Sequence, residues 1–287
     1  MDWRHPLITI DQNQLRHPDA IARALNECCR NKLQLLLPDG AFSEFSKGGC
    51  TLETARRSLQ LLAPYRELVC SSRKIAEMMR NELEGRAPCG SLVQAESTMF
   101  LRSILEELEH NDETTLRKLV DGPIAELMPQ ALAVWNDHDR NRQTIRELHD
   151  VLKRSFSADQ LKAIHRFPEC GISEWLSSSH GIRFVYQGLK ARGADDATAY
   201  KLTRSPSVNA GFMSALAGIA VYWLAFGGLA TAAAKESSGD LHDVEYIILG
   251  ALSRSLESVD RRAIIIYRAV AGAFETRRSL PTPTGYA

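Results

Sequence analysis

The sequence predicts an α/β protein in which a parallel sheet is interrupted by a long helical segment. Strand and helix patterns alternate over the first 85 residues, only helical periodicity is present from about residue 90 to residue 235, and the alternation then returns. Alternating strands and helices are typical of a parallel sheet with helices on both faces. We therefore divide the chain into an N-terminal half (1–89), a helical insertion (90–235) and a C-terminal half with a tail (236–287).

The N-terminal half begins with an apolar strand, "LITI" at Leu7–Ile10. A helix is expected over His17–Asn31, because its apolar residues recur at helical spacing and Pro18 suits a first turn. "LQLLLPDG" at Leu33–Gly40 predicts a buried strand that ends in a turn, and "AFSEF" begins the helix after it.

Another helix, a short strand and a further helix complete this half. "TLETARRSLQLL" predicts the first helix, and "RELVC" at Arg66–Cys70 predicts the third strand. "SSRKIAEMMRNEL" predicts the second helix, with Ser71 or Ser72 as its N-cap because serine hydroxyls accept hydrogen bonds from free N–H groups there.

The helical insertion carries three apolar stripes with a period near 3.6 residues, which predicts packed amphipathic helices. Loops are expected at Ser177–Gly181 and Lys190–Asp196. The stripes contain these residues: Leu101, Ile104, Leu105 and Leu108; Leu116, Leu119, Val120, Ile124 and Leu127; Ile145, Leu148, Val151 and Leu152.

One stretch is long enough to cross a membrane. Ser205–Ala234 has no charged residue, and Gly211–Ala234 matches the length of a membrane span. It is rich in Ala and Gly rather than Leu and Ile, and small residues let a helix pack closely in a protein core. We expect a buried core helix, with a membrane-anchored helical protein as the alternative.

The C-terminal half returns to α/β character. "DLHDVEYIILGALSRS" predicts a helix, and Leu256–Val259 predicts a short strand that ends at Asp260. "RRAIIIYRAVAGAF" predicts the closing helix. The tail Glu275–Ala287 is expected to be mobile.

The composition, the net charge and the Cys and His positions are those of an ordinary globular protein with reduced thiols and no zinc site. Of 287 residues, 44% are hydrophobic and 24% charged, which is ordinary for a globular protein. Lys+Arg and Asp+Glu both number 35, so no overall field draws the protein to nucleic acid. The six Cys form no C-x-x-C pair, and without a signal peptide they indicate reduced thiols in the cytoplasm. The eight His do not lie at zinc-ligand spacing.

Four acids are expected at one edge of the sheet. Asp11 and Asp260 each follow a strand, and ligands of open parallel sheets bind outside the carboxyl ends of the strands. Glu44 follows the second strand, and Asp243 begins a late helix. The third acid is open among Asp240, Asp243 and Glu245. Like charges repel when brought together, and a divalent cation would relieve that repulsion.

Oxygen ligands favour Mg²⁺ or Mn²⁺. One or two such ions can activate a water for hydrolysis of a phosphodiester. Each acid also has a plain structural interpretation, because Asp11 and Asp260 suit helix N-caps and Glu44 and Asp243 suit exposed first turns.

Four stretches, "LITIDQNQL", "PDGAFSEF", "DVEYIILGAL" and "LESVDRR", resemble the acid-bearing motifs of PIN-domain nucleases. The resemblance covers roughly residues 5–85 and 236–275. It implies a three-layer PIN-like parallel sheet with flanking helices, interrupted here by the all-α insertion. It also implies an Mg²⁺- or Mn²⁺-dependent endoribonuclease whose catalytic and metal-binding residues are Asp11, Glu44, Asp243 and Asp260, supported by Asn13 and Ser258.

The resemblance further implies an RNA substrate, a role as a toxin or in phage defence, and an inhibitory antitoxin or defence partner. A cytoplasmic protein without a membrane partner, and a homodimer, are expected. "DQN" departs from the more usual Asp-Thr-Asn of the family. Arg261 and Arg262 are candidate phosphate contacts, whereas Arg277 and Arg278 are expected in solvent. The alternative function is a non-catalytic interaction module on the same scaffold.

Overall fold

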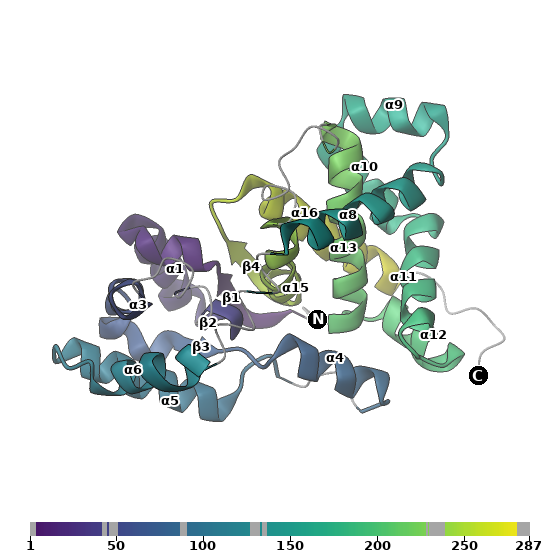
Figure 1. Cartoon of the computed structure of the whole chain (residues 1–287). Coiled ribbons are helices and arrows are strands. Elements are labelled where there is room, and N and C mark those ends of the chain that lie inside the picture. The colour runs from purple at the N-terminus through teal and green to yellow at the C-terminus, as the bar shows by residue number, and fades with distance from the viewer. Residues whose placement is uncertain are drawn as a thin grey trace.

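The computed structural model describes residues 4–41, 45, 51–86, 91–126, 133, 137–227, 229 and 239–279 (Figure 1). Four strands and a larger number of helices make up this part of the chain. The strands are β1 (His5–Ile10), β2 (Gln34–Leu37), β3 (Val69–Ser71) and β4 (Ser253–Glu257). The α-helices are α1 (Pro18–Asn31), α3 (Thr51–Gln60), α4 (Ile75–Leu83), α5 (Ala95–Glu109), α6 (Thr114–Leu119), α8 (His138–Lys153), α9 (Ala158–Arg166), α10 (Pro168–Ser177), α11 (Ser179–Ala191), α12 (Asp196–Arg204), α13 (Val208–Phe226), α15 (Val244–Leu252) and α16 (Arg261–Ser279).

The four strands form one parallel sheet in the order β3-β2-β1-β4. The chain moves from β1 outward to β2 and β3, and then returns to the other side of β1 to add β4. The order of the strands therefore reverses between β1 and β4. The expectation of a parallel sheet with helices on both faces is confirmed.

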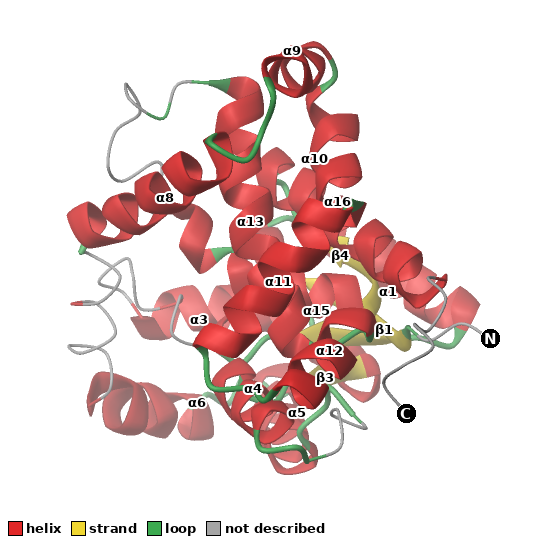
Figure 2. Cartoon of the chain, turned by 90° about the vertical axis from the view of Figure 1, so that its right-hand side faces the viewer, coloured by secondary structure: helices red, strands yellow, loops and turns green. Residues whose placement is uncertain are grey.

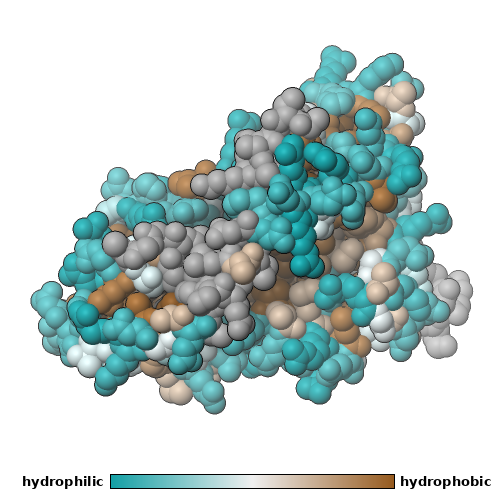
Figure 3. Space-filling view, viewed as in Figure 1, coloured by the Kyte–Doolittle hydropathy of each residue, from teal (hydrophilic) through white to brown (hydrophobic). Residues whose placement is uncertain are grey.

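Alternate residues of β1 enter two separate hydrophobic clusters, one on each face of the sheet. Ile8 and Ile10 join the cluster that contains apolar residues of α1, α3, α5 and α6. Leu7 joins the larger cluster, which contains apolar residues of α8 to α13, α15 and α16. Figures 1 and 2 show the resulting layers, with the short sheet enclosed by helices. The face in Figure 3 is largely hydrophilic, with brown limited to small areas.

The segment 90–235 contributes helices to both faces. α5 packs on β3 and on the 3-10 helix Ala63–Leu68, beside α3. α8 and α9 pack with α13 in the other cluster, where α10 also contacts α16. The helices of this segment therefore complete the same two cores that the strands begin.

Helix α13 is the buried centre of the larger cluster. Among the described residues it is the one helix long and apolar enough, by length and composition, to cross a membrane, and most of it is buried inside the protein. A side chain at Gly218 would collide with Ile266 of α16, so the small residue permits this close approach. The buried helix expected over Gly211–Ala234 is confirmed as far as Phe226, and most of the remainder lies outside the described residues.

A buried carboxylate holds the first turn of α13. Glu82, at the end of α4, accepts hydrogen bonds from the backbone N–H groups of Val208 (2.8 Å) and Asn209 (2.9 Å). The Asn209 side chain also donates to Glu82 (2.9 Å) and to the Met79 carbonyl (2.8 Å). These contacts satisfy donors that a helix start leaves open and place a negative charge at the positive end of the helix dipole.

Two predicted boundaries are wrong near the third and fourth strands. β4 begins at Ser253, inside the stretch predicted as helix, and follows α15 without a connecting loop. β3 begins at Val69, because Ala63–Leu68 forms a 3-10 helix. Neither Ser71 nor Ser72 caps α4, whose N-cap is Lys74. Ser72 instead accepts a hydrogen bond from the backbone N–H of Asp39 (2.9 Å).

Two predicted irregular segments are helical. Ser177–Gly181 joins α10 to α11 with Ser178 as the N-cap, so it is almost continuous helix. α16 extends to Ser279, which places Glu275–Ser279 in a helix rather than in a mobile tail. The rest of the predicted tail lies outside the described residues.

We predict that Ile219→Asp lowers the free energy of unfolding by at least about 4 kcal/mol, because it buries an unpaired charge in α13. Ile219 is 1% exposed. Met99→Asp is the matched control, since Met99 is a helical residue that is 66% exposed and should tolerate the charge. Urea unfolding and recovery of soluble protein measure both effects, and equal losses would contradict the buried position of α13.

A second prediction concerns the pH dependence of stability. Burial raises the pKa of Glu82 above its ordinary value of 4.5, against the opposing effect of its hydrogen bonds to Asn209 and Val208. A raised pKa in the folded state gives stability that is complete below the unfolded pKa and is lost as pH rises through the folded pKa. The unfolding free energy of the wild type should therefore fall, relative to that of Glu82→Gln, as pH rises from about 4 toward neutrality.

Urea unfolding at a series of pH values tests this difference. Glu84→Gln is the control, because Glu84 is exposed at the end of the same helix. A difference between wild type and Glu82→Gln that stays constant over the range would contradict the prediction.

Candidate functional site at the carboxyl edge of the sheet

The carboxyl ends of β1 and β4 lie side by side and bring Asp11 next to Ser258. Ile10 pairs with Glu257, and the Asp11 N–H donates to the Glu257 carbonyl (2.9 Å), which extends the ladder by one residue. The Ser258 hydroxyl donates to Asp11 Oδ2 at 2.6 Å, and the Asn13 backbone N–H donates to Oδ1 at 3.0 Å. The buried carboxylate of Asp11 is therefore fixed by both strands.

Ser258 also links Asp11 to Asp260. The Ser258 oxygen accepts a hydrogen bond from the Asp260 N–H (3.0 Å). Asp260 Oδ1 in turn accepts from the backbone N–H groups of Arg262 (2.7 Å) and Ala263 (3.3 Å) at the start of α16. Ser258 therefore contacts both residues, and Asp260 caps the closing helix as its plain structural interpretation predicted.

A buried aspartate, an arginine and a tryptophan adjoin this pair. Asp240 Oδ1 lies 3.1 Å from Arg262 Nη1, and Asp240 Oδ2 accepts a hydrogen bond from Trp223 Nε1 (2.7 Å). Arg262 Nε lies 3.9 Å from Asp260, and the guanidinium stands 5.7 Å from the centre of the Trp223 ring. Arg262 therefore supplies positive charge to two of the acids at this edge.

These charges extend to a neighbouring tyrosine. Burial raises the pKa of Tyr222, and the positive charge of Arg262 opposes this effect while Asp240 and Asp260 add to it. Tyr222 also stacks on Phe226, with ring centres 4.4 Å apart. The apolar helix α13 thus presents Tyr222 and Trp223 to the acids at the end of β4.

The three candidates for the third acid occupy different positions. Asp240 is the buried one, as described above. Asp243 is the N-cap of α15, but its side chain makes no capping hydrogen bond. The Glu245 carboxylate packs against Gly40, where any side chain would collide with it, so the first turn of α15 reaches the end of β2.

One acid at this edge was missed by the sequence analysis. Asp39 follows β2 after a single residue, as Asp11 follows β1, and the same rule for strand ends would have identified it. Burial raises the pKa of Asp39, while the charge of Lys74 acts in the opposite direction. Asp39 therefore belongs with the acids of the carboxyl edge.

Of the four predicted metal ligands, the structure describes Asp11, Asp243 and Asp260. Glu44 lies outside the described residues. Ser258 links the Asp11 carboxylate to the backbone N–H of Asp260, whereas the Asp260 carboxylate accepts hydrogen bonds from the start of α16. Carboxylate oxygens of this kind suit Mg²⁺. Among the described residues, however, no three His, Cys, Asp or Glu side chains form a group that could hold a metal ion. The described side chains alone do not complete a metal site.

The four arginines singled out in the sequence differ in exposure. The Arg261 side chain is 80% exposed and pairs with Glu169 (3.3 Å), whereas that of Arg262 is 24% exposed and pairs with acids of the carboxyl edge. Arg261 is thus the more accessible candidate phosphate contact. The prediction that Arg277 lies in solvent is wrong, because it is buried against α10 and α13, whereas Arg278 is exposed as predicted.

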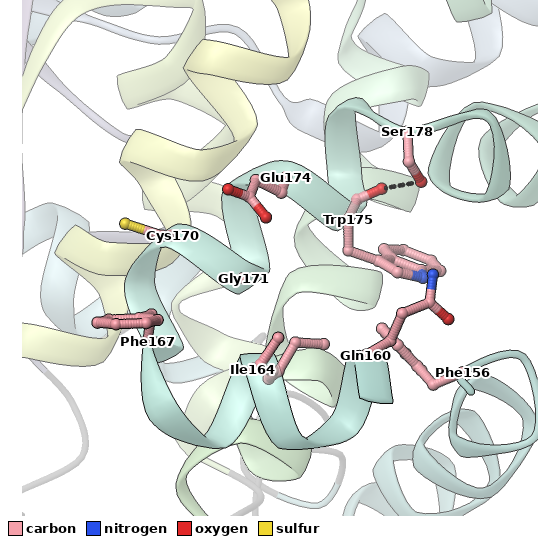
Figure 4. Close-up of a pocket in the computed structure, with 10 residues that line it drawn as sticks. Phe156, Gln160, Ile164, Phe167, Cys170, Gly171, Glu174, Trp175 and Ser178 are labelled. Atoms are coloured by element: carbon pink, nitrogen blue, oxygen red, sulfur yellow. Dashed lines mark hydrogen bonds between the residues drawn. The ribbon is translucent and has the colours of Figure 1, made fainter. Parts of the chain in front are cut away.

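Cavities also lie among the described helices beyond the acids. One of about 460 Å³ is lined by α9 and α10, where the Trp175 ring lies 5.7 Å from that of Phe156 (Figure 4). It is separate from the carboxyl edge. Another, of about 440 Å³, is bordered by Trp223, which also contacts Asp240 and Arg262, and by the basic side chains Arg146 and Lys153.

We predict that Arg262→Ala lowers the free energy of unfolding by about 2–4 kcal/mol, because it leaves the buried Asp240 carboxylate without its cation. Arg261→Ala is the adjacent control and should cost less than about 0.5 kcal/mol, since its ion pair is exposed. Denaturant unfolding of the two variants measures the difference. Equal effects would show that Arg262 does not compensate the acids.

Comparison with known proteins identifies no relative. No family model matches the chain, and no curated protein or solved structure matches it. The function proposed below therefore depends on the residues and their geometry.

Proposed function

We propose that this protein is a metal-dependent phosphodiester hydrolase, an endoribonuclease of PIN-like type. The observation that supports it best is the position of Asp11 and Asp260 after two neighbouring strands. In open α/β sheets, ligands bind where the strand order reverses, outside the carboxyl ends of the strands. That point lies between β1 and β4 in this sheet, and these two acids follow those strands.

In this proposal the carboxylates of Asp11, Glu44, Asp243 and Asp260 hold Mg²⁺ or Mn²⁺. A bound ion of this kind lowers the pKa of its water and stabilises charge on a transferring phosphoryl group. Ser258 and the Asn13 backbone N–H orient the Asp11 carboxylate through the hydrogen bonds described above. Such outer partners fix the geometry of a ligand and strongly affect metal affinity.

The cavity bordered by Trp223 supports a nucleic-acid substrate. Its lining includes the cationic side chains Arg146 and Lys153, with Asp150 as an acid on the same surface. Cationic side chains of this kind bind phosphates and supply affinity without reading sequence. A single strand bound here would lie beside the acids, because Trp223 borders the cavity and also contacts Asp240. Toxin or phage-defence roles, with an inhibitory partner, extend the same proposal.

One observation favours the alternative of a non-catalytic interaction module. Arg262 already pairs with Asp240 and lies 3.9 Å from Asp260, so these two acids have less need of a metal cation than the sequence suggested. The two functions differ in one measurable property, because only the nuclease needs a divalent ion for activity.

We predict that Asp11→Asn abolishes Mg²⁺- or Mn²⁺-dependent cleavage of RNA while the protein remains folded. The substitution keeps the shape of the side chain and removes its charge. The loss should exceed the roughly 10–100-fold effect of removing an outer-shell partner of a metal ligand. Fluorescently labelled single-stranded and structured RNA, with and without EDTA, provides the measurement.

Asp19→Asn is the matched control, because Asp19 is an exposed acid in the first turn of α1. It should leave the cleavage rate unchanged. Activity of the wild type that survives EDTA would contradict the metal-dependent mechanism. Folded wild type with no divalent-dependent cleavage of any RNA tested would favour the interaction module.

A further inference from the structure

A separate cavity of about 370 Å³ lies between α11, α12 and the C-terminal end of α16. We call it the arginine pocket, because Arg183, Arg204 and Arg277 all line it. The remaining described residues of its lining are neutral and include Ile182, Tyr186 and Tyr200. A cavity whose charged lining is entirely cationic favours an anionic ligand.

Arg277 is the buried member of these three arginines. It is 1% exposed, and it donates to the Ser214 hydroxyl (3.0 Å) and the Leu176 carbonyl (2.9 Å), both neutral acceptors. Its Nε is buried without a hydrogen-bond partner among the described residues. Burial lowers the pKa of Arg277 to about 10.

A buried guanidinium without a counter-ion is costly, since charge taken out of water needs an opposite charge or a full set of acceptors. No described carboxylate forms an ion pair with Arg277, although Arg262, at the other end of the same helix, has two such partners. An anion in the arginine pocket would provide the missing charge.

Two further arginines and a helix end surround the same space. Arg204, in the last turn of α12, lies over the Tyr200 ring with its guanidinium carbon 5.5 Å from the ring centre. Arg183 projects from α11, and Ser179, the first residue of that helix, also lines the cavity. Helix starts present free N–H groups and a positive dipole end to anions.

We propose that the arginine pocket binds the phosphate monoester of a nucleotide-sized molecule, because three arginines meet there beside the start of α11 and no described lining residue is an acid. A phosphate monoester carries about −1.5 to −2 charges near neutral pH, and guanidinium groups match its oxygens in paired hydrogen bonds. Tyr186, Tyr200 and Ile182 provide surface for the organic body. The volume falls in the range of small-molecule sites, roughly 300–1,000 Å³.

This pocket is distinct from the carboxyl edge. Arg262 and Arg277 lie near opposite ends of α16, separated by roughly 22 Å at 1.5 Å per residue. Binding at the arginine pocket therefore does not depend on the proposed nuclease activity.

Isothermal titration calorimetry of the full chain with AMP, inorganic phosphate and adenosine tests the proposal. AMP and phosphate should bind and compete with each other, and adenosine alone should not bind measurably. Arg183→Gln and Arg204→Gln should each weaken AMP binding by about tenfold, the effect of losing one hydrogen bond to a charged group. Arg192→Gln is the matched control, because Arg192 follows α11 and contacts Phe212 outside the pocket.

A competition step identifies the source of the phosphate. A ribo-oligonucleotide with a 5′-phosphate that displaces AMP, while its 5′-hydroxyl form does not, indicates an RNA end. If neither oligonucleotide displaces AMP, the ligand is a free mononucleotide. No binding of AMP or phosphate at millimolar concentration, or unchanged AMP affinity in both pocket variants, would overturn the proposal.

Thermal unfolding gives an independent readout. AMP should raise the melting temperature of the wild type and of Arg192→Gln, because a ligand that binds only the folded state stabilises it. The shift should be smaller for Arg183→Gln and Arg204→Gln at the same AMP concentration. An equal shift in all four proteins would place AMP elsewhere on the molecule and contradict the assignment.

Discussion

The pairing of β1 with β4 is the constraint on which the rest of this structure depends. It joins Asp11 to Ser258, which are 247 residues apart in the chain. The flanking elements have little freedom once that register is set, because α15 ends where β4 begins and α16 starts directly after Asp260. A register shift of one residue would turn every side chain of the strand to the opposite face. The acids of the carboxyl edge are therefore positioned by sheet geometry rather than by the conformation of a long loop.

Arg262 changes the electrostatic argument that the sequence suggested. Acids gathered at one edge repel one another, and from sequence alone a divalent ion is the obvious source of compensating charge. In the structure an arginine already bridges Asp240 and Asp260, with Trp223 beside it. A metal bound here would share Asp260 with that arginine, whereas the Asp11 carboxylate is oriented by Ser258 from the neighbouring strand.

Much of the architecture follows from apolar periodicity, and the errors have identifiable physical causes. The runs in β1 and β2 and the stripe in α5 predict their elements well, because local pattern and burial agree there. The start of β4 was missed because the apolar pattern of α15 continues into the strand without a turn signal. The role of Ser72 could not be predicted locally, because its partner, the Asp39 N–H, lies in the turn after β2.

In the candidate site, too, features set by the local sequence could be predicted, and features set by contacts between distant residues could not. Asp11 and Asp260 were predicted because each follows a strand. Asp39 also follows a strand, so the same rule would have identified it. Arg261 and Arg262 are identical neighbours in sequence, and only the packing of α16 makes one of them exposed and the other an internal counter-ion.

The position of β1 also has a consequence for biosynthesis. A ribosome must add more than about 240 residues after β1 before β4 exists, so β1 keeps an unpaired edge while that stretch is synthesised, and exposed strand edges invite pairing with other chains.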